Sequence, residues 1–222
     1  VPKQDATSCG NVIEGTRIVC FKVPLKKVLS VCNIKTNTFY YIWDVPALLE
    51  KLPTLGAVID LTNTARYYDP EGVLHKKILM PGRIIPPEDK VAEFMDTVDE
   101  FLGKDCESLI GVHCTHGLNR TGYMVCRYMR DRLGVPAKDA IKKFEKARGY
   151  QIERENYIAD LLGTTPPPPD VGKETDIKPV SKRQTPYKRS PLAEDEDLEG
   201  RRFRIDNLFF NTFAQKLHLR RI

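Results

Sequence analysis

The stretch GVHCTHGLNRTGYMVCRYM (residues 111–129) decides the fold, because a short polar loop in it separates an apolar run from a helical pattern. The run SLIGVHC (108–114) predicts a buried strand, and apolar residues at 124, 125, 128, 129 and 133 predict a helix over 120–134. The loop carries Cys114 and, six positions later, Arg120. It therefore lies at a helix N-terminus, where free N–H groups and the helix dipole favour an anion.

The residue types of this loop suit phosphoryl transfer. Gly117 lets the backbone turn, so that successive N–H groups form a nest around a phosphoryl group. Arg120 offers a planar fork for two phosphate oxygens, and the same positive potential lowers the pKa of Cys114 and keeps it a thiolate. Thr121 can donate a hydrogen bond to that sulfur when it becomes the leaving group. We expect Cys114 and Arg120 to be catalytic, in a two-step displacement through a phosphocysteine.

The other residues near Cys114 have supporting roles in this prediction. His113 either orients the backbone of Cys114 or is a hydrogen-bonded core histidine. The competing interpretation, an inert buried cysteine beside an arginine that pairs elsewhere, leaves the fixed spacing of these residue types unexplained. The remaining members of the loop are expected to surround the substrate phosphate: Thr115, His116, Leu118 and Asn119.

Strands and helices alternate on both sides of this loop. Short apolar runs predict strands at 55–64 and 75–80, and periodic patterns with start and stop signals predict helices at 86–103, 136–148 and 153–162. Gly149 and Gly163 close the last two helices. The sequence therefore predicts an α/β fold, a central mostly parallel sheet flanked by helices.

Composition limits the compartment and the cofactors. Hydrophobic residues make up 41% of the 222 residues, and no apolar run is long enough to span a membrane. The six cysteines are scattered without a C-x-x-C pair or a His/Cys cluster, so we expect a reducing compartment, no metal site and no cofactor. The chain opens on Val1, so the natural N-terminus is expected to lie further upstream.

Composition changes after Gly163, where the sequence TTPPPPD begins a stretch rich in proline and charged residues. We place a catalytic domain at 8–163 and a disordered Pro-rich, basic tail at 164–222. The basic segment KPVSKRQTPYKRSP (178–191) suits nuclear import or RNA contact, and the alternative is a merely solubilising run. We expect a nuclear location, with the cytoplasm as the alternative, and a monomer. Apolar residues spaced four apart near the end favour a helix that docks on a protein partner: Phe209, Phe213 and Leu217.

The loop also carries a family resemblance. H-C-x-x-G-x-x-R-T-G resembles cysteine-dependent phosphatases of the tyrosine and dual-specificity type, and the fuller string resembles their RNA 5′-triphosphatase branch, which has baculovirus and animal members. The match extends to FKVPL (21–25), IDLTNTARYYD (59–69) and FEKARGYQIERENYIADLL (144–162). The resemblance implies a tyrosine/dual-specificity phosphatase-like fold and a substrate that is RNA with a 5′-triphosphate or 5′-diphosphate end.

One residue of the tyrosine phosphatases is missing. Those enzymes use an upstream aspartate to protonate the departing phenolate, and this chain has Gly82 and Arg83 at that place. Glu88 and Asp89 are expected to be first-turn helix acids instead. A phenol has a pKa of about 10 and leaves badly without a proton, whereas a diphosphate leaves readily. The missing acid therefore favours a phosphoanhydride substrate over a phosphoprotein, which remains the alternative, as does a non-catalytic phosphate-binding module.

Further polar residues are candidates for supporting the loop or binding the substrate. Asp60 ends a strand and either fixes the loop through hydrogen bonds or caps a turn. Tyr67 and Tyr68 either stack on a base or pack in the core. Four arginines are candidates for the other phosphates of the chain end, against the alternative of a solvated surface: Arg66, Arg83, Arg148 and Arg154. Whether hydrolysis stops at the diphosphate or continues to the monophosphate is left open.

Overall fold

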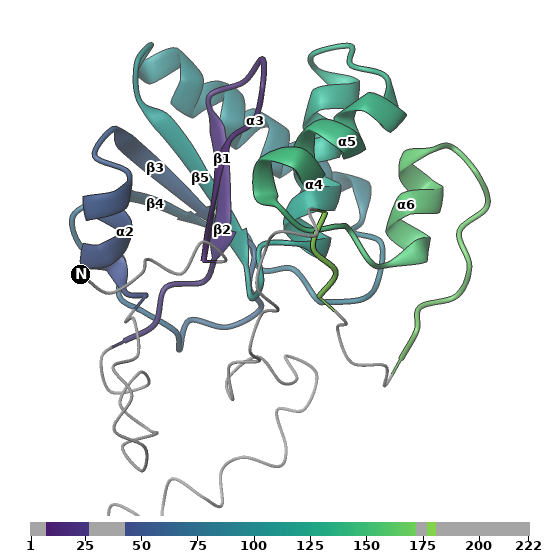
Figure 1. Ribbon diagram of the computed structural model, residues 1–222, viewed down its shortest axis with the longest axis horizontal. Helices are drawn as coiled ribbons and strands as arrows, with labels where there is room; N and C mark the ends of the chain where they lie inside the picture. The colour runs from purple at the N-terminus through teal and green to yellow at the C-terminus, as the bar shows by residue number, and fades with distance from the viewer. Residues whose placement is uncertain (1–7, 27–42, 172–176, 181–222) are drawn as a thin grey trace, which may run out of the picture.

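A mixed five-stranded sheet forms the centre of the computed structural model, which describes residues 8–26, 43–171 and 177–180 (Figure 1). The strand order is β1-β2-β5-β3-β4, with β1 antiparallel to β2 and every other pair parallel. The mostly parallel sheet predicted from the sequence is thereby confirmed. The strands are β1 (Cys9–Val12), β2 (Ile18–Lys22), β3 (Leu55–Asp60), β4 (Leu74–Lys77) and β5 (Leu109–Cys114).

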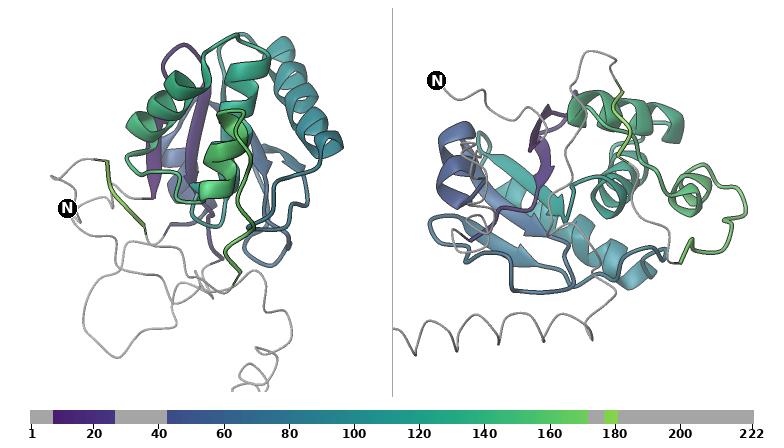
Figure 2. Two further views of the ribbon diagram at one scale, coloured as in Figure 1. Left: turned by 90° about the vertical axis from the view of Figure 1, so that its right-hand side faces the viewer. Right: turned by 60° about the horizontal axis from the view of Figure 1, so that its bottom comes forward.

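Helices cover both faces of this sheet (Figures 1 and 2). One face packs against α3 and α4, with α5 beside β1 and β2 and α6 on the outer side of α4. The other face packs against α2. The helices are α2 (Val45–Lys51), α3 (Glu88–Lys104), α4 (Asn119–Asp131), α5 (Ala137–Arg148) and α6 (Glu155–Leu161).

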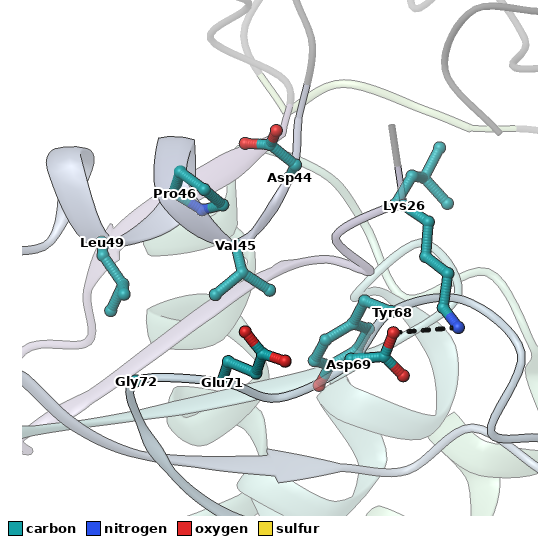
Figure 3. Close-up of a pocket in the computed structure, with 10 residues that line it drawn as sticks. Lys26, Asp44, Val45, Pro46, Leu49, Tyr68, Asp69, Glu71 and Gly72 are labelled. Atoms are coloured by element: carbon teal, nitrogen blue, oxygen red, sulfur yellow. Dashed lines mark ion pairs between the residues drawn. The ribbon is translucent and has the colours of Figure 1, made fainter. Parts of the chain in front are cut away.

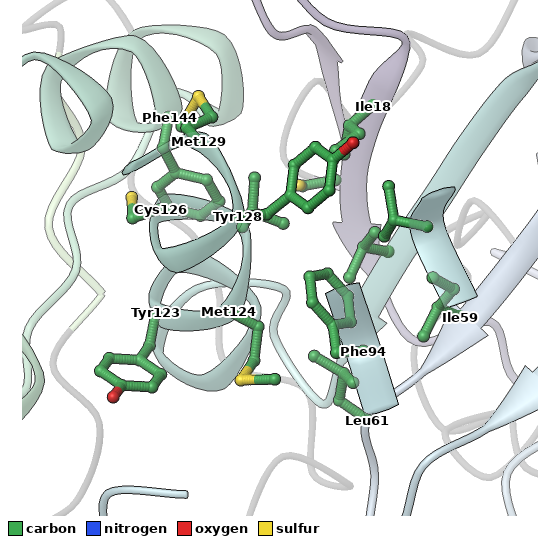
Figure 4. Close-up of a cluster of buried hydrophobic side chains, with 14 of the residues drawn as sticks. Ile18, Ile59, Leu61, Phe94, Tyr123, Met124, Cys126, Tyr128, Met129 and Phe144 are labelled. Carbon is green, nitrogen blue, oxygen red and sulfur yellow. The ribbon is translucent and has the colours of Figure 1, made fainter. Parts of the chain in front are cut away.

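Strand side chains alternate between two cores, as the pleat requires. Ile18 and Ile59 point into the larger core, together with Phe94 of α3 and Met124 of α4 (Figure 4). Their neighbours on the other face pack with Trp43 and Leu48 of the α2 region: Val19, Phe21 and Val58. Because both faces of the strands are buried, the sheet holds the end of β5 rigidly.

Glycines follow α5 and α6 as predicted, whereas Gly103, the last residue of the helix predicted at 86–103, lies within α3. Gly149 follows α5 in the left-handed region with φ 85°, and Gly163 lies just beyond α6 with φ 71°. The predicted strand at 75–80 is shorter in the structure, because β4 pairs with β3 and the pairing stops where β3 ends, at Asp60 opposite Lys77. The β1–β2 hairpin and α2 were not predicted.

Contacts with the domain continue beyond the boundary predicted at Gly163. The Val180 N–H donates to the Gly149 carbonyl at 3.0 Å, and the Gln151 N–H donates to the Lys178 carbonyl at 3.0 Å. The predicted boundary therefore leaves out short segments that contact the domain. Most of the predicted tail lies outside the described residues, including the basic run beyond Val180 and the apolar residues near the C-terminus. None of the helices in the described ranges is long and apolar enough to cross a membrane.

Candidate active site

The phosphate loop connects β5 to α4 at the carboxyl end of the parallel strands. Cys114 is the last residue of β5 and α4 begins at Asn119. Gly117 has φ 66°, and a Cβ there would lie 2.1 Å from the carbonyl oxygen of Phe21 in β2. The loop therefore packs so closely on β2 that a glycine is required in this left-handed position.

Cys114 differs from the other buried cysteines in its electrostatics. Burial alone raises the pKa of its thiol, but the Arg120 charge, the Thr121 hydroxyl and the N–H groups of Thr121 and Leu118 outweigh burial, so the net pKa lies below the ordinary thiol value. Thr121 Oγ1 is buried and has no oxygen or nitrogen partner in the described ranges, which leaves its hydroxyl to the sulfur. Burial instead raises the pKa of the thiols of Cys9, Cys20 and Cys126.

Arg120 is held by carbonyl groups from two other segments. Its Nη1 donates to the Leu61 carbonyl at 3.1 Å and to the Met80 carbonyl at 2.7 Å, and its Nη2 donates to Thr115 Oγ1 at 3.2 Å. The side chain is 5% exposed. These contacts fix a planar guanidinium beside the Cys114 thiol and bring the segment after β4 to the loop.

Arg148 contacts the backbone of the phosphate loop. Its Nη2 donates to the His116 carbonyl at 2.8 Å and its Nε donates to the Gly117 carbonyl at 3.2 Å. Arg148 is buried. A guanidinium used in this way binds two loop carbonyls and supports the loop, and a contact of Arg148 with another phosphate stays a prediction.

His113 connects the loop to a tyrosine. Its Nδ1 lies 3.1 Å from the Cys114 carbonyl and its Nε2 lies 2.6 Å from Tyr68 Oη. Burial lowers the pKa of His113, which favours the neutral ring, with Nδ1 donating to the carbonyl and Nε2 accepting from the tyrosine. Tyr67 and Tyr68 are both buried, so they pack in the core rather than offer free rings to a base.

Asp60 is the centre of a buried polar cluster at the end of β3. It accepts hydrogen bonds from the Thr62 N–H at 2.8 Å, the Thr62 hydroxyl at 2.7 Å and Lys77 Nζ at 2.9 Å. Burial alone raises its pKa, but the charge and hydrogen bond of Lys77, with His75 Nε2 also 3.7 Å away, hold the pKa of this carboxyl well below its usual range. Asp60 is therefore ionised at neutral pH and is unsuited to donating a proton.

Asn119 and Asn156 hold the backbone of two of the predicted arginines, Arg154 and Arg83. The Asn119 side-chain oxygen accepts hydrogen bonds from the backbone of Glu153 and Arg154, at 2.9 and 3.2 Å. Asn156 Nδ2 donates to the Arg83 carbonyl at 2.7 Å. Arg66, by contrast, is exposed, with its guanidinium 5.4 Å from the centre of the Tyr67 ring.

The sequence reasoning missed three polar residues of this region: Lys77, Asn156 and Asp170. Lys77 ends β4 directly opposite Asp60 in the parallel register. Its charge, within a run predicted to be a strand, was the sequence signal that could have identified it. Asn156 lies in the matched segment 144–162 but had no assigned role. Asp170 follows four prolines in the expected tail, and no local pattern marks it.

A hollow of about 790 Å³ lies between α2 and the loop after β3 (Figure 3). Val45 and Leu49 line one side, and the Lys26–Asp69 ion pair, 3.1 Å long, lies at the other. Tyr68 also lines it, so the hollow reaches the tyrosine that contacts His113.

The side chains of the described ranges form no group of three or more His, Cys, Asp or Glu that could hold a metal ion.

Comparison with known proteins identifies the family of this site. Residues 44–165 match the family described as dual specificity phosphatase, catalytic domain. The Tyrosine-protein phosphatase of Autographa californica nuclear polyhedrosis virus is 49% identical over 159 residues, covering 69% of this chain and 93% of that protein. The human RNA/RNP complex-1-interacting phosphatase is 43% identical over 164 residues, covering 71% of this chain and 50% of that protein.

A solved structure agrees with the fold. The crystal structure of Tk-PTP in the active form superposes with a TM-score of 0.51 at 16% identity, covering 70% of this chain and 97% of that chain. The matched ranges include β5, the loop and α4, where the thiol of lowered pKa lies at a helix N-terminus beside a fixed arginine. The chain belongs to the dual-specificity phosphatase family and is a cysteine-dependent phosphatase.

Proposed function

We propose that this phosphatase removes the γ-phosphoryl group from RNA with a 5′-triphosphate end. The Cys114 thiolate attacks the γ-phosphorus, forming an S–P bond while the P–O bond to the β-phosphate breaks. Arg120 and the loop N–H groups bind the equatorial oxygens of the transferring group. Water then attacks the phosphorus, the S–P bond breaks, and the water proton leaves with the phosphate. Thr121 donates a hydrogen bond to the departing sulfur.

One observation carries this choice of substrate: the segment beside Arg120 offers an arginine where a general acid is needed for a phenol. Met80 contacts Arg120, and three residues later comes Arg83. The next carboxylate along the chain, Glu88, forms an ion pair with Arg127 at 2.8 Å. Asp60 is ionised, as described above. A diphosphate leaving group needs no proton, so this arrangement supports cleavage of a phosphoanhydride.

The comparisons support RNA as the carrier of that phosphoanhydride. The human relative is named as an RNA/RNP complex-1-interacting phosphatase. The baculovirus relative is named a tyrosine-protein phosphatase, which favours the second candidate, a protein phosphatase of dual specificity. Removal of the β-phosphoryl group from diphosphate-ended RNA is a further activity for the same loop.

Phosphate release from triphosphate-ended RNA and from a phosphotyrosine peptide distinguishes the candidates. We expect kcat/KM for the RNA to exceed that for the peptide by about 100-fold or more, because general acid help of that order is missing for the phenolate. Cys114→Ser should abolish both activities, since a protonated hydroxyl cannot replace the thiolate. Comparable rates on both substrates would reject the RNA assignment in favour of the protein phosphatase.

A further inference from the structure

Beside the phosphate loop, an aspartate from the chain after α6 meets two arginines. Asp170 belongs to residues 164–171, which we call the strap; it leaves the end of α6 at the right of Figure 1. Asp170 Oδ2 lies 2.6 Å from Arg154 Nη1, and the Asp170 carbonyl accepts a hydrogen bond from Arg83 Nη1 at 2.9 Å. A single residue thus engages both guanidinium groups.

Both arginines are tied to the loop that would hold the scissile phosphate. The backbone of Arg154 is fixed by the side chain of Asn119, the first residue of α4. Arg83 follows Met80, whose carbonyl binds Arg120, by three residues. Arg83 also has φ 71°, a left-handed conformation rare for a residue with a side chain, and its carbonyl is held by Asn156. Such strain persists only where surrounding contacts impose it, and it gathers at functional sites.

The strap is held at its start by hydrogen bonds from Thr164 to the Ala159 carbonyl of α6 and near its end by Asp170. Its three prolines at 167–169 are exposed, and Val171 is 84% exposed, while Asp170 is half-buried. The proline run 166–169 is stiff and extended, so it holds Asp170 at a fixed reach from α6.

The Asp170 contact is also incomplete. Its second carboxylate oxygen, Oδ1, is buried and has no hydrogen-bond partner in the described part of the chain. A buried oxygen without a donor carries a desolvation cost, so the contact is weaker than a fully paired one and an anion of higher charge can displace it.

We propose that Arg83 and Arg154 form a second anion subsite, which binds the phosphoryl groups adjacent to the scissile one, and that Asp170 occupies this subsite when substrate is absent. The inference rests on the proposed function in one respect, that the substrate is a polyphosphate. Asp170 acts as an internal competitor: a polyphosphate has enough charge to displace it, whereas a single phosphoryl group reaches only the loop. The strap therefore lowers the apparent affinity of the subsite and favours polyphosphate ends.

Binding of inorganic tripolyphosphate tests the subsite without RNA or turnover. In a Cys114→Ser background, Asp170→Asn should lower the calorimetric Kd for tripolyphosphate about three- to tenfold, the range expected for removing one charged competitor from a hydrogen-bonded pair. The Kd for orthophosphate should change much less. Glu155→Gln is the matched control, because it removes the same charge from an exposed position next to Arg154.

Arg154→Gln provides the opposite change. It should weaken tripolyphosphate binding about tenfold while orthophosphate binding persists, with thermal melting used to confirm a folded protein. An unchanged Kd for Asp170→Asn, or equal shifts in Asp170→Asn and Glu155→Gln, would overturn the proposal.

The outcome is separable from that of the proposed function. Tighter tripolyphosphate binding by Asp170→Asn, in a protein that fails to hydrolyse triphosphate RNA, would keep the subsite and reject the RNA assignment. Hydrolysis of triphosphate RNA, together with unaltered tripolyphosphate binding by Asp170→Asn, would keep the RNA assignment and reject the subsite.

Discussion

At the scale of single residues, the phosphate loop depends on the missing side chain of Gly117. Gly117→Ala would place a Cβ 2.1 Å from the Phe21 carbonyl oxygen, so the loop must move away from β2. A misplacement of reacting groups by about 1 Å costs about 100-fold in rate. We expect at least that loss in kcat/KM, measured by phosphate release.

Gly134→Ala is the matched control for this substitution. Gly134 has the same φ of 66°, but apart from its chain neighbours no atom of the described residues lies within 4 Å of the position its Cβ would take. It should cost about 1 kcal/mol of stability from the left-handed conformation alone and leave the rate unchanged. Equal losses of rate in both variants would show that the strained left-handed backbone, and not the clash with β2, causes the loss.

Arg120, with the Thr121 hydroxyl, lowers the pKa of the Cys114 thiol and thereby the pH at which Cys114 becomes reactive. The thiolate is the reactive form, so kcat/KM rises with pH along a limb that lies below the ordinary thiol pKa. Thr121→Val removes the hydroxyl that stabilises the thiolate, and we expect this limb to move to higher pH. The pH profile of kcat/KM measures the shift; an unmoved limb would mean that Arg120 and the backbone alone hold the pKa.

At the scale of elements, the ends of β3 and β4 are joined by the buried Asp60–Lys77 pair. Asp60→Asn leaves the half-buried Lys77 ammonium without its carboxylate. Breaking one partner of a buried pair costs about 3 kcal/mol, so urea unfolding at pH 7 should show a loss of that order. Glu100→Gln, which removes a carboxylate from the exposed Glu100–Lys104 pair of α3, should change the free energy of unfolding little.

The same pair gives a pH dependence of defined sign. The folded-state pKa of Asp60 lies below the unfolded value of about 3.9, so the folded protein binds fewer protons there. Its stabilisation is therefore complete above about pH 5 and is lost as the pH falls below 4. The difference between the parent protein and Asp60→Asn should shrink in that acid range. A difference that stays constant down to pH 2 would contradict the low pKa.

At the scale of the whole molecule, we expect the catalytic unit to fold and act without the chain that follows α6. A protein ending at Gly163 should fold and hydrolyse triphosphate RNA, because the loop and the Leu61 and Met80 carbonyls that hold Arg120 precede that residue. It lacks the two backbone hydrogen bonds made by Lys178 and Val180, each worth about 1 kcal/mol, so it should melt below a protein ending at Val180. A folded but inactive shorter protein would place the later chain in the active site.

We also propose a nuclear location that depends on the basic segment 178–191. Its lysine and arginine pairs suit an import receptor. A fluorescent fusion of the full chain should accumulate in the nucleus, and one ending at Val180 should not. Equal distribution of the two fusions would assign the segment a solubilising or RNA-binding role.

The sequence by itself determined the features that arise from neighbouring residues. The strand, loop and helix that contain Cys114, Gly117 and Arg120 lie within one contiguous stretch, and the anion nest follows from local backbone geometry. The glycine stops after α5 and α6 are local in the same sense. The mostly parallel sheet follows from the alternation of strands and helices.

Only the tertiary structure decided which distant side chains meet. Arg66, Arg83, Arg148 and Arg154 are equivalent in the sequence, yet one is exposed, one supports the loop carbonyls and two engage Asp170. The antiparallel β1–β2 hairpin and the partners of Asp60 depend likewise on strand order and register. The physical reason is that a guanidinium or carboxylate is defined by its burial and by the groups across from it, and those come from segments far apart in the chain.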